Sequence, residues 1–238
     1  RYRGDFCIGA DGAVSRVRRA LCPDLRPALA GALEAEVQPP GDDMGPWRGQ
    51  ATFVLSPAPW TYAWAFPKAD HLSVGIGGFA PGRHPLRRQL EAHARRLGLE
   101  VPKARGHPLP VYRPARRLGT RRVLLVGDAA ALVDPFFGEG MRYAIWSASQ
   151  AAEALLAGDV AGYTRRIRRF MDREMRAARF LAEVFYRWPG ACFRMGVRNP
   201  RATAAFMGLL AGTRSYAGVM WRLLLSLVES VGRGGWSS

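Results

Sequence analysis

The chain has 238 residues, 48% of them hydrophobic and seven of them tryptophan, which excludes a disordered basic tail and provides enough apolar surface for a folded core. The formal net charge is +16, carried almost entirely by arginine, because Lys68 and Lys103 are the only lysines. A charge of this size attracts nucleic acid, anionic lipid and phosphorylated ligands alike, so charge alone does not choose among them.

The first half of the chain predicts a strand–helix unit followed by a sheet. Residues 6–9 indicate the end of a buried strand, and a short helix is expected from Ser15 to Leu21, before Pro23. Residues 34–79 hold short aromatic or β-branched stretches separated by proline, glycine and aspartate, a pattern that predicts an antiparallel sheet. An amphipathic helix is expected over residues 84–99.

The second half returns to strand and helix. A strand is expected over residues 123–126, followed by helices over about residues 140–156 and 160–187, the second rich in arginine. The last expected helix covers roughly residues 201–231. Arg214 and Arg222 divide its apolar runs, which are shorter than the roughly 20 residues of a membrane span. We expect a core or lid helix, with a position in the membrane surface as the alternative.

Two motifs place glycine and aspartate directly after predicted strands. In the first motif, Gly127 and Asp128 follow the strand 123–126. An apolar loop with Pro135 comes next, and Gly138-Glu139-Gly140 then starts a helix. Ligands of α/β sheets lie at the carboxyl ends of strands, where a carboxylate commonly binds ribose hydroxyls. The N–H groups of a helix start suit an anion or a polarised carbonyl. A plain strand–loop–helix connection is the alternative for Gly-Asp alone.

The second motif is the sequence CIGADGAVSRVRRAL, residues 7–21, where a strand again leads through Asp11-Gly12 into a short helix. Taken alone, it is equally compatible with an ordinary Asp-Gly turn.

A third pattern lies in residues 59–67, where Trp60, Tyr62, Trp64 and Phe66 alternate with small residues. Alternation places all four rings on one strand face, which either packs as sheet core or lines a long apolar pocket. The glycines of residues 75–78 remove side chains where a flat group could lie.

In this order, the two motifs resemble the DG and GD motifs of flavoprotein hydroxylase-like FAD enzymes. The phrase Pro59-x-x-Tyr62-x-Trp64-x-Phe66-Pro67, with Gly75-x-Gly77-Gly78, is similar to the geranylgeranyl reductase family. The resemblance covers residues 7–155 most strongly. It implies an FAD-dependent oxidoreductase that reduces C=C bonds of a polyprenyl chain by hydride transfer from reduced flavin, with NADPH or ferredoxin as reductant.

The resemblance also implies a fold and a set of site residues. The fold would be α/β with α+β character: a partial Rossmann-like, hydroxylase-type FAD-binding domain over 1–33 and 106–180, an antiparallel-sheet substrate domain over 34–105, and a helical C-terminal region over 181–238. The implied cofactor-binding residues are Ala10, Asp11, Gly12, Gly127, Asp128, Pro135, Gly138, Glu139, Gly140 and Met141. The implied substrate-binding residues are Tyr62, Trp64, Phe66, Gly75, Gly77 and Gly78.

No catalytic side chain is assigned, and water is one source of the proton. Glu139 is either an acid–base group near the flavin or, as its position favours, a residue that serves the helix start.

The chain departs from the family at its amino end. The family begins with a βαβ unit carrying G-x-G-x-x-G, which holds the ADP half of FAD, and residues 1–238 contain no such unit. We therefore expect the sequence to be a carboxyl-terminal portion of a longer enzyme that binds FAD weakly or not at all by itself.

Two alternatives to this function remain. A flavin-dependent monooxygenase or halogenase of the same superfamily would need a polar pocket or a lysine near the flavin. A basic nucleic-acid or membrane-binding module would use charge, but no nucleic-acid recognition motif is present. One basic cluster comprises Arg113, Arg116, Arg117, Arg121 and Arg122. It either attracts NADPH or a lipid pyrophosphate, or it forms only a solvated face.

The expected partners and compartment follow from these inferences. The substrate would be a prenylated lipid, quinone or pigment, with a peripheral membrane contact allowed and no nucleic acid expected. Three widely spaced cysteines and four histidines show no disulfide or metal-ligand spacing, so no metal site is expected and a reducing cytoplasm fits.

Overall fold

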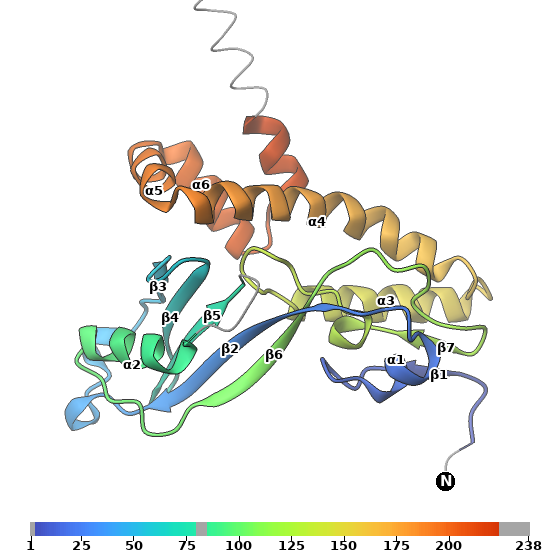
Figure 1. The fold of residues 1–238 in the computed structure, drawn as a ribbon, viewed down its shortest axis with the longest axis horizontal. Coiled ribbons are helices and arrows are strands. Elements are labelled where there is room, and N and C mark those ends of the chain that lie inside the picture. Colours follow the sequence, from blue (N-terminus) through green and yellow to red (C-terminus); the bar gives the residue numbers. More distant parts are fainter. Residues whose placement is uncertain (1–2, 80–84, 224–238) are drawn as a thin grey trace, which may run out of the picture.

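The computed structural model describes residues 3–79 and 85–223. Two sheets organise these residues, a two-stranded parallel sheet of order β1-β7 and a five-stranded antiparallel sheet of order β3-β4-β5-β2-β6. Figure 1 shows the larger sheet at one end, the smaller at the other, and the long helix α4 crossing above both. The predicted mixed α/β and α+β fold is therefore confirmed.

The parallel sheet brings the two glycine–aspartate motifs together. Strand β1 (Cys7–Gly9) leads to helix α1 (Arg16–Leu21), and β7 (Val123–Leu125) leads through a 3-10 turn (Gly127–Ala130) toward α3 (Met141–Leu156). The strands pair in register, with Gly9 opposite Leu125, and the N–H of Val126 donates to the Gly9 carbonyl at 3.0 Å. Both strands thus end at the same edge of the sheet.

Strand β1 differs from the buried strand that the sequence indicated. Phe6 is 51% exposed and Ile8 is 45% exposed, and Cys7 is exposed as well. The reason is its place in the sheet: among the described residues β1 pairs with β7 alone, so its outer edge and much of its surface face solvent.

The antiparallel sheet is confirmed and is larger than expected. Its strands are β2 (Ala28–Val37), β3 (Thr52–Leu55), β4 (Thr61–Pro67), β5 (Leu72–Gly78) and β6 (Arg105–Val111). Two short 3-10 turns, Pro40–Asp42 and Gly45–Trp47, lie between β2 and β3. Helix α2 (Leu86–Arg96) covers one face, where Leu90 and Ala94 pack against Ala63, Ala65 and Ile76. His84, expected in this helix, lies outside the described residues.

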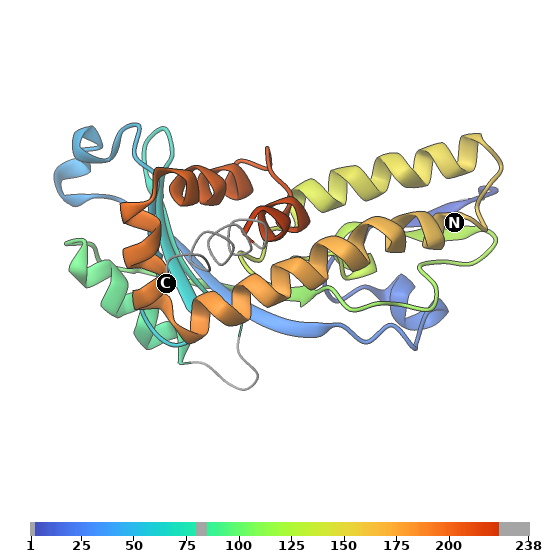
Figure 2. The ribbon, with the colours of Figure 1, turned by 90° about the horizontal axis from the view of Figure 1, so that it is seen from above.

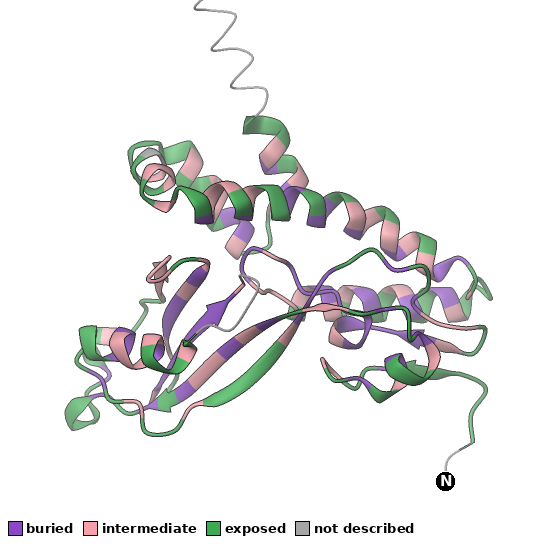
Figure 3. Cartoon of the chain, in the orientation of Figure 1, coloured by how far each residue is buried: buried purple, intermediate pink, exposed green. Residues whose placement is uncertain are grey.

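Helices cover the other face. Helix α4 (Tyr163–Arg187) runs the length of the molecule beside α3, as Figure 2 shows, and is followed by α5 (Pro189–Arg198) and α6 (Pro200–Leu210). Figure 3 shows buried residues in the central strands β4 and β5, in the loop before α3 and along the inner side of α4. No helix within the described ranges combines the length and apolar content needed to cross a membrane.

The single helix expected over roughly 201–231 is wrong. Helix α6 ends at Leu210, Gly212 takes a positive φ of 69°, and a new helical stretch covers residues 216–223. A left-handed glycine ends a helix because it costs no steric strain there, and the sequence pattern of apolar residues continued across this break. Residues 224–231 of the expected helix lie outside the described residues.

Candidate functional site

Gly127 begins the site at the carboxyl end of β7. Its φ is +53°, and a Cβ built on it would lie 2.9 Å from the Cβ of Ala144 in α3. Its N–H donates to the buried hydroxyl of Ser147 at 2.9 Å. Glycine at this position is therefore required both by the backbone conformation and by the close approach of the 3-10 turn to α3.

Asp128 presents a carboxylate at the start of α3. A Cβ added to Gly140, the residue that precedes α3, would lie 3.1 Å from Oδ1 of Asp128. Burial raises the pKa of Asp128, and the nearby Arg18 cation opposes that shift. Within the part of the chain that the structure describes, the carboxylate accepts no hydrogen bond, although it is half-buried. It is therefore a free acceptor beside a helix N-terminus.

Arg18 joins the two glycine–aspartate motifs, and the sequence did not reveal this. Its side chain is 6% exposed and donates from Nη1 to the carbonyls of Asp128 at 2.9 Å and Ala129 at 3.0 Å. Its Nη2 donates to the carbonyl of Ala13 in the first motif. Burial lowers the pKa of Arg18, while Asp11 and Asp128 favour its charged form. A buried cation thus fixes the two bends against each other.

Asp11 uses its carboxylate within its own motif. Oδ1 accepts from the Ser15 hydroxyl at 2.5 Å, and Oδ2 accepts from the N–H of Arg16 at 2.7 Å and of Val17 at 3.2 Å. These hydrogen bonds, that from Ser15 first, hold the pKa of Asp11 below its usual value. Gly12 follows with a φ of +77°. In this structure Asp11 therefore caps α1, and its implied role in cofactor binding stays a prediction.

The loop from Asp134 to Gly140 is organised by a residue that the sequence analysis missed. The fully buried carboxylate of Asp134 accepts from the N–H groups of Phe136 at 2.7 Å, Phe137 at 2.9 Å and Glu139 at 2.7 Å. Burial raises its pKa, and the three backbone hydrogen bonds oppose the shift. An aspartate that bonds the backbone two and three residues ahead is a common turn signal. The Asp-Pro dipeptide could have indicated it.

Tyr216 adds a fourth donor from far along the chain. Its hydroxyl donates to Oδ1 of Asp134 at 3.0 Å, and its backbone N–H donates to Oε2 of the buried Glu174 in α4 at 2.9 Å. The loop, α4 and the helical stretch 216–223 are therefore tied together through two buried carboxylates.

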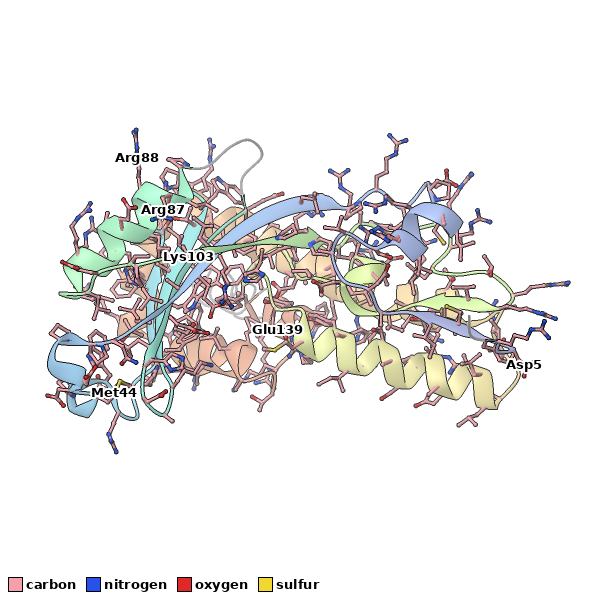
Figure 4. The ribbon with its side chains drawn as sticks, turned by 90° about the horizontal axis from the view of Figure 1, so that it is seen from below. Asp5, Met44, Arg87, Arg88, Lys103 and Glu139 are labelled. Atoms are coloured by element: carbon pink, nitrogen blue, oxygen red, sulfur yellow. The ribbon has the colours of Figure 1, made fainter. Side chains whose placement is uncertain are left out.

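Glu139 serves the start of α3, as expected. Its Oε1 accepts from the N–H of Arg142 at 2.8 Å, and its Oε2 lies 3.4 Å from Nε of Arg142 as an ion pair without a hydrogen bond. Figure 4 shows Glu139 at the beginning of α3, between the two ends of the molecule. The N–H groups of Gly138, Gly140 and Met141 make no hydrogen bond within the described residues. These amides remain available to an anion or a carbonyl oxygen.

The ring-bearing face of β4 is occupied by its own side chains. The centroids of Tyr62 and Trp64 lie 5.4 Å apart, and those of Trp64 and Phe66 lie 6.1 Å apart. A Cβ on Gly75 would lie 2.1 Å from the Trp64 ring, so the flat group over this glycine is the protein's own indole. Gly77 likewise lies under the rings of Tyr62 and Phe79.

Trp60 does not belong to the strand face on which the sequence placed it. It precedes β4 with a φ of +57°, and its ring stacks on Tyr186 of α4 at 5.3 Å. A turn closes here, because the Thr61 hydroxyl donates to the carbonyl of Ala58 at 2.8 Å. Together with Tyr186, Trp60 borders a surface hollow of about 540 Å³ that Tyr62, Trp64 and Phe66 do not line.

The ring face and the loop before α3 meet at two aromatic residues. The Tyr62 and Phe137 rings lie edge to face with centroids 6.4 Å apart, and Tyr62 also stacks on Phe79 at 5.9 Å. Phe79 in turn approaches Gly138, where an added Cβ would lie 2.9 Å from its ring. The candidate substrate face, the free loop amides and Asp128 therefore form one continuous region.

Comparison with known proteins relates the chain to named reductases. No family model matches the chain. The chain is 36% identical over 190 residues to the chloroplastic geranylgeranyl diphosphate reductase of Oryza sativa subsp. japonica, an alignment covering 76% of this chain and 39% of the relative. It is 35% identical over 181 residues to digeranylgeranylglycerophospholipid reductase 2 of Methanothermobacter thermautotrophicus, covering 71% and 45%. The chain thus spans less than half the length of these curated relatives.

Solved structures agree on the fold. A geranylgeranyl bacteriochlorophyll reductase-like protein from Thermoplasma acidophilum superposes with a TM-score of 0.65 at 26% identity, over 77% of this chain and 51% of that one. CmlS, a flavin-dependent halogenase, superposes with a TM-score of 0.55 at 21% identity, over 77% and 39%. The fold is that of flavin-dependent hydroxylase-like enzymes, and the chain belongs to the geranylgeranyl reductase family.

Proposed function

We propose that this chain is part of an FAD-dependent reductase that saturates C=C bonds of a geranylgeranyl-type polyprenyl chain. The observation that carries the proposal is the meeting of three features: the free Asp128 carboxylate, the free amides from Gly138 to Met141, and the rings of Tyr62 and Phe137. The names of two relatives support the substrate class, because each name denotes a reductase of a geranylgeranyl compound. The domain division at residues 33/34, 105/106 and 180/181 is part of the same proposal.

The residues of the site fit a flavin. Asp128 would accept a hydrogen bond from a hydroxyl of the cofactor's ribityl or ribose portion, and the amides of Gly138, Gly140 and Met141 would donate to a ring carbonyl. Small, buried alanines at positions 129–131 leave no side chain to block its approach. When bound, the flavin supplies the hydride that is added to the alkene carbon. The proposed cofactor-binding set is completed by Ala10, Asp11, Gly12, Gly127, Pro135 and Glu139.

The protein's contribution is a loop shaped in advance. Asp134 holds three loop amides in place, and Arg18 holds the turn that carries Asp128. The start of α3 carries the positive end of the helix dipole, which stabilises negative charge that develops on a group placed there. Donors fixed before the reaction cost no reorganisation when that charge appears, so this loop would favour the reduced, anionic form of the cofactor.

The substrate side of the proposal is apolar. The partly exposed rings of Tyr62 and Phe66 would border a prenyl chain, with the buried ring of Trp64 packed against both, and aromatic surface excludes water. Gly75 and Gly77 lie beneath the rings, and Gly78, opposite Thr61 in the same sheet, completes the proposed substrate-binding set. Burial raises the pKa of Tyr62 well above the physiological range, so its hydroxyl stays protonated and neutral. The prenyl chain would be carried by a lipid, quinone or pigment. NADPH or reduced ferredoxin would supply the electrons, and anaerobic titration with each separates the two.

The helical end supports the proposed peripheral contact of a cytoplasmic protein with a membrane. Trp188 is 58% exposed and Phe193 is 60% exposed, and the exposed cations Arg187, Arg194 and Arg198 lie in the same stretch of chain. Exposed aromatic rings together with arginine favour an anionic bilayer surface. Flotation with vesicles containing phosphatidylglycerol should recover the protein, and Trp188→Ser with Phe193→Ser should reduce that recovery.

The test of the reductase begins with the cofactor. The longer protein of which this chain is proposed to be part is purified and titrated with FAD, followed by flavin fluorescence. It is then reduced anaerobically and mixed with geranylgeranyl diphosphate. We expect oxidised-flavin absorbance to return as a product two hydrogens heavier per reduced double bond appears. Asp128→Asn should weaken FAD binding about tenfold, because a hydrogen bond to a charged carboxylate becomes a weaker one to a neutral amide oxygen. Asp24→Asn, an exposed aspartate outside the site, is the matched control.

Two outcomes would contradict the proposal. Equal FAD affinity in the Asp128→Asn variant would remove Asp128 from the cofactor site. Reoxidation that requires oxygen and an aromatic acid, with no reduced prenyl product, would identify a monooxygenase instead.

A further inference from the structure

A second region lies outside the proposed flavin site, in a surface hollow of about 500 Å³ between the first half of α4 and the loop that follows β6. Four guanidinium groups line it, from Arg116 in the loop and from Arg165, Arg168 and Arg169 in α4. Its one carboxylate is Asp172. Four cations and one anion leave a net charge of +3 around the hollow. The two segments that line the hollow lie about 50 residues apart in the sequence.

The helix period explains how the cations gather. Residues 165, 168, 169 and 172 follow the i, i+3, i+4, i+7 spacing, so they share one face of α4. Ile167 and Met171 are fully buried on the opposite face, which fixes the rotation of the helix. The Thr164 hydroxyl accepts from the N–H of Leu118 at 3.0 Å, and Leu118 is itself buried, so the loop that carries Arg116 is tied to α4.

The single carboxylate is already in use. Oδ1 of Asp172 accepts from the Tyr112 hydroxyl at 2.5 Å, and Oδ2 accepts from Nε and Nη2 of Arg168 at 3.3 and 3.2 Å. Asp172 therefore holds Arg168 in position and neutralises that one cation. None of the ion pairs formed by the described residues includes the other three lining arginines, which are Arg116, Arg165 and Arg169.

We propose that this hollow binds the phosphate groups of a soluble, phosphorylated small molecule. Guanidinium groups match phosphate oxygens through paired N–H donors, and an anion would relieve the repulsion among three uncompensated cations. The hollow is shallow and open, and its volume is within the roughly 300–1,000 Å³ range of small-molecule sites. This proposal is independent of the flavin, and for Arg116 it favours a phosphate-binding use over a merely solvated face.

The direct test is isothermal titration calorimetry of the purified protein with inorganic pyrophosphate, phosphate and ADP at near-physiological salt. We expect saturable binding of pyrophosphate, weaker binding of phosphate, and binding of ADP at least as tight as pyrophosphate if the hollow also contacts a nucleoside. The double variant Arg165→Gln/Arg169→Gln should weaken pyrophosphate binding about tenfold or more.

A charge-matched control separates a site from general attraction to a basic protein. Arg121→Gln/Arg122→Gln removes two exposed cations that do not line the hollow and should change the dissociation constant less than about twofold, the effect of losing only distant, screened charge. Arg116→Gln tests the same hollow from the loop and should weaken binding about tenfold by itself. Thermal unfolding of each variant establishes that it is folded.

Three results would overturn the proposal. One is the absence of saturable pyrophosphate binding at millimolar concentration. Another is equal weakening by the two double variants, which would indicate long-range charge alone. The third is recovery of the protein on anionic vesicles that depends on Arg165 and Arg169 while none of the soluble phosphates competes, which would assign the patch to a membrane.

Discussion

The two regions that the sequence marked as functional differ in what occupies them. Around the loop before α3, polar groups are left free: the Asp128 carboxylate and the amides of Gly138, Gly140 and Met141 have no partner among the described residues. On the ring face of β4, the space above Gly75 is filled by Trp64 of the same chain. The loop is therefore prepared to receive a group, whereas the inner part of the ring face is packed as core.

The contrast shows that glycines in this sequence serve two different structural purposes. Gly127 and Gly138 take positive φ values where the backbone must turn toward a site. Gly75 lies in an extended strand and makes room for a neighbouring ring. Substitutions at the two regions should therefore fail in different ways.

The largest effect is expected at Asp134. Asp134→Ala removes the acceptor for three buried or half-buried amides and for the hydroxyl of Tyr216. Each unsatisfied buried donor costs about 1–3 kcal/mol, and the loss of a buried charge offsets part of that sum. The substitution should therefore lower the free energy of unfolding by about 3 kcal/mol. Urea unfolding measures it. Asp24→Ala, at an exposed aspartate, should change the same quantity by less than about 0.5 kcal/mol.

Gly75→Ala should come next. The added Cβ would meet the buried Trp64 ring, and overpacking of a core typically costs about 1–3 kcal/mol. Gly106→Ala is the control, because its Cβ would lie 3.5 Å from the nearest atom, an ordinary contact. If thermal unfolding shows Gly75→Ala to be as stable as the parent chain, the ring face is loosely packed and the contrast between the regions disappears.

Tyr216→Phe should have a smaller and more local effect. It removes one hydrogen bond to the Asp134 carboxylate, with an expected loss of about 1–2 kcal/mol in unfolding free energy. Hydrogen–deuterium exchange should show faster exchange at the amides of Phe136, Phe137 and Glu139 and unchanged exchange in β4 and β5. Uniformly faster exchange would mean that Tyr216 stabilises the whole molecule rather than this loop.

The smallest effect is expected at Asp11, which is exposed. Hydrogen bonds lower its pKa in the folded state, so its ionised form contributes stability above the unfolded value near 3.8, and that contribution is lost as the pH falls through the lower, folded pKa. Asp11→Asn should therefore be slightly less stable than the parent at pH 7, with the difference shrinking toward pH 3 in thermal unfolding. A difference that grows on acidification would contradict this role.

The sequence predicted those parts of the site that depend on local geometry. Gly127, Asp128 and Gly140 follow strand and helix boundaries, which are visible over a few residues. Asp134 was not predicted, although its partners are only two to five residues away and the Asp-Pro dipeptide is a local turn signal. Tyr216 lies 82 residues from Asp134, and no local pattern encodes such a contact. The break at Gly212 was missed because apolar residues continue on both sides of it.

The position of Tyr216 has a mechanical consequence. One residue is bonded through its backbone to Glu174 and through its hydroxyl to Asp134, so the stretch that begins at 216 cannot lift from α4 without pulling a donor from the carboxylate that shapes the loop. Anything that displaces the last described turns of the chain, whether a lipid tail or a neighbouring protein, would thereby alter how firmly the loop from Asp134 to Gly140 can hold an electron-rich ring. Displacement of these turns by a molecule that approaches from that side would then change the affinity of the loop for such a ring.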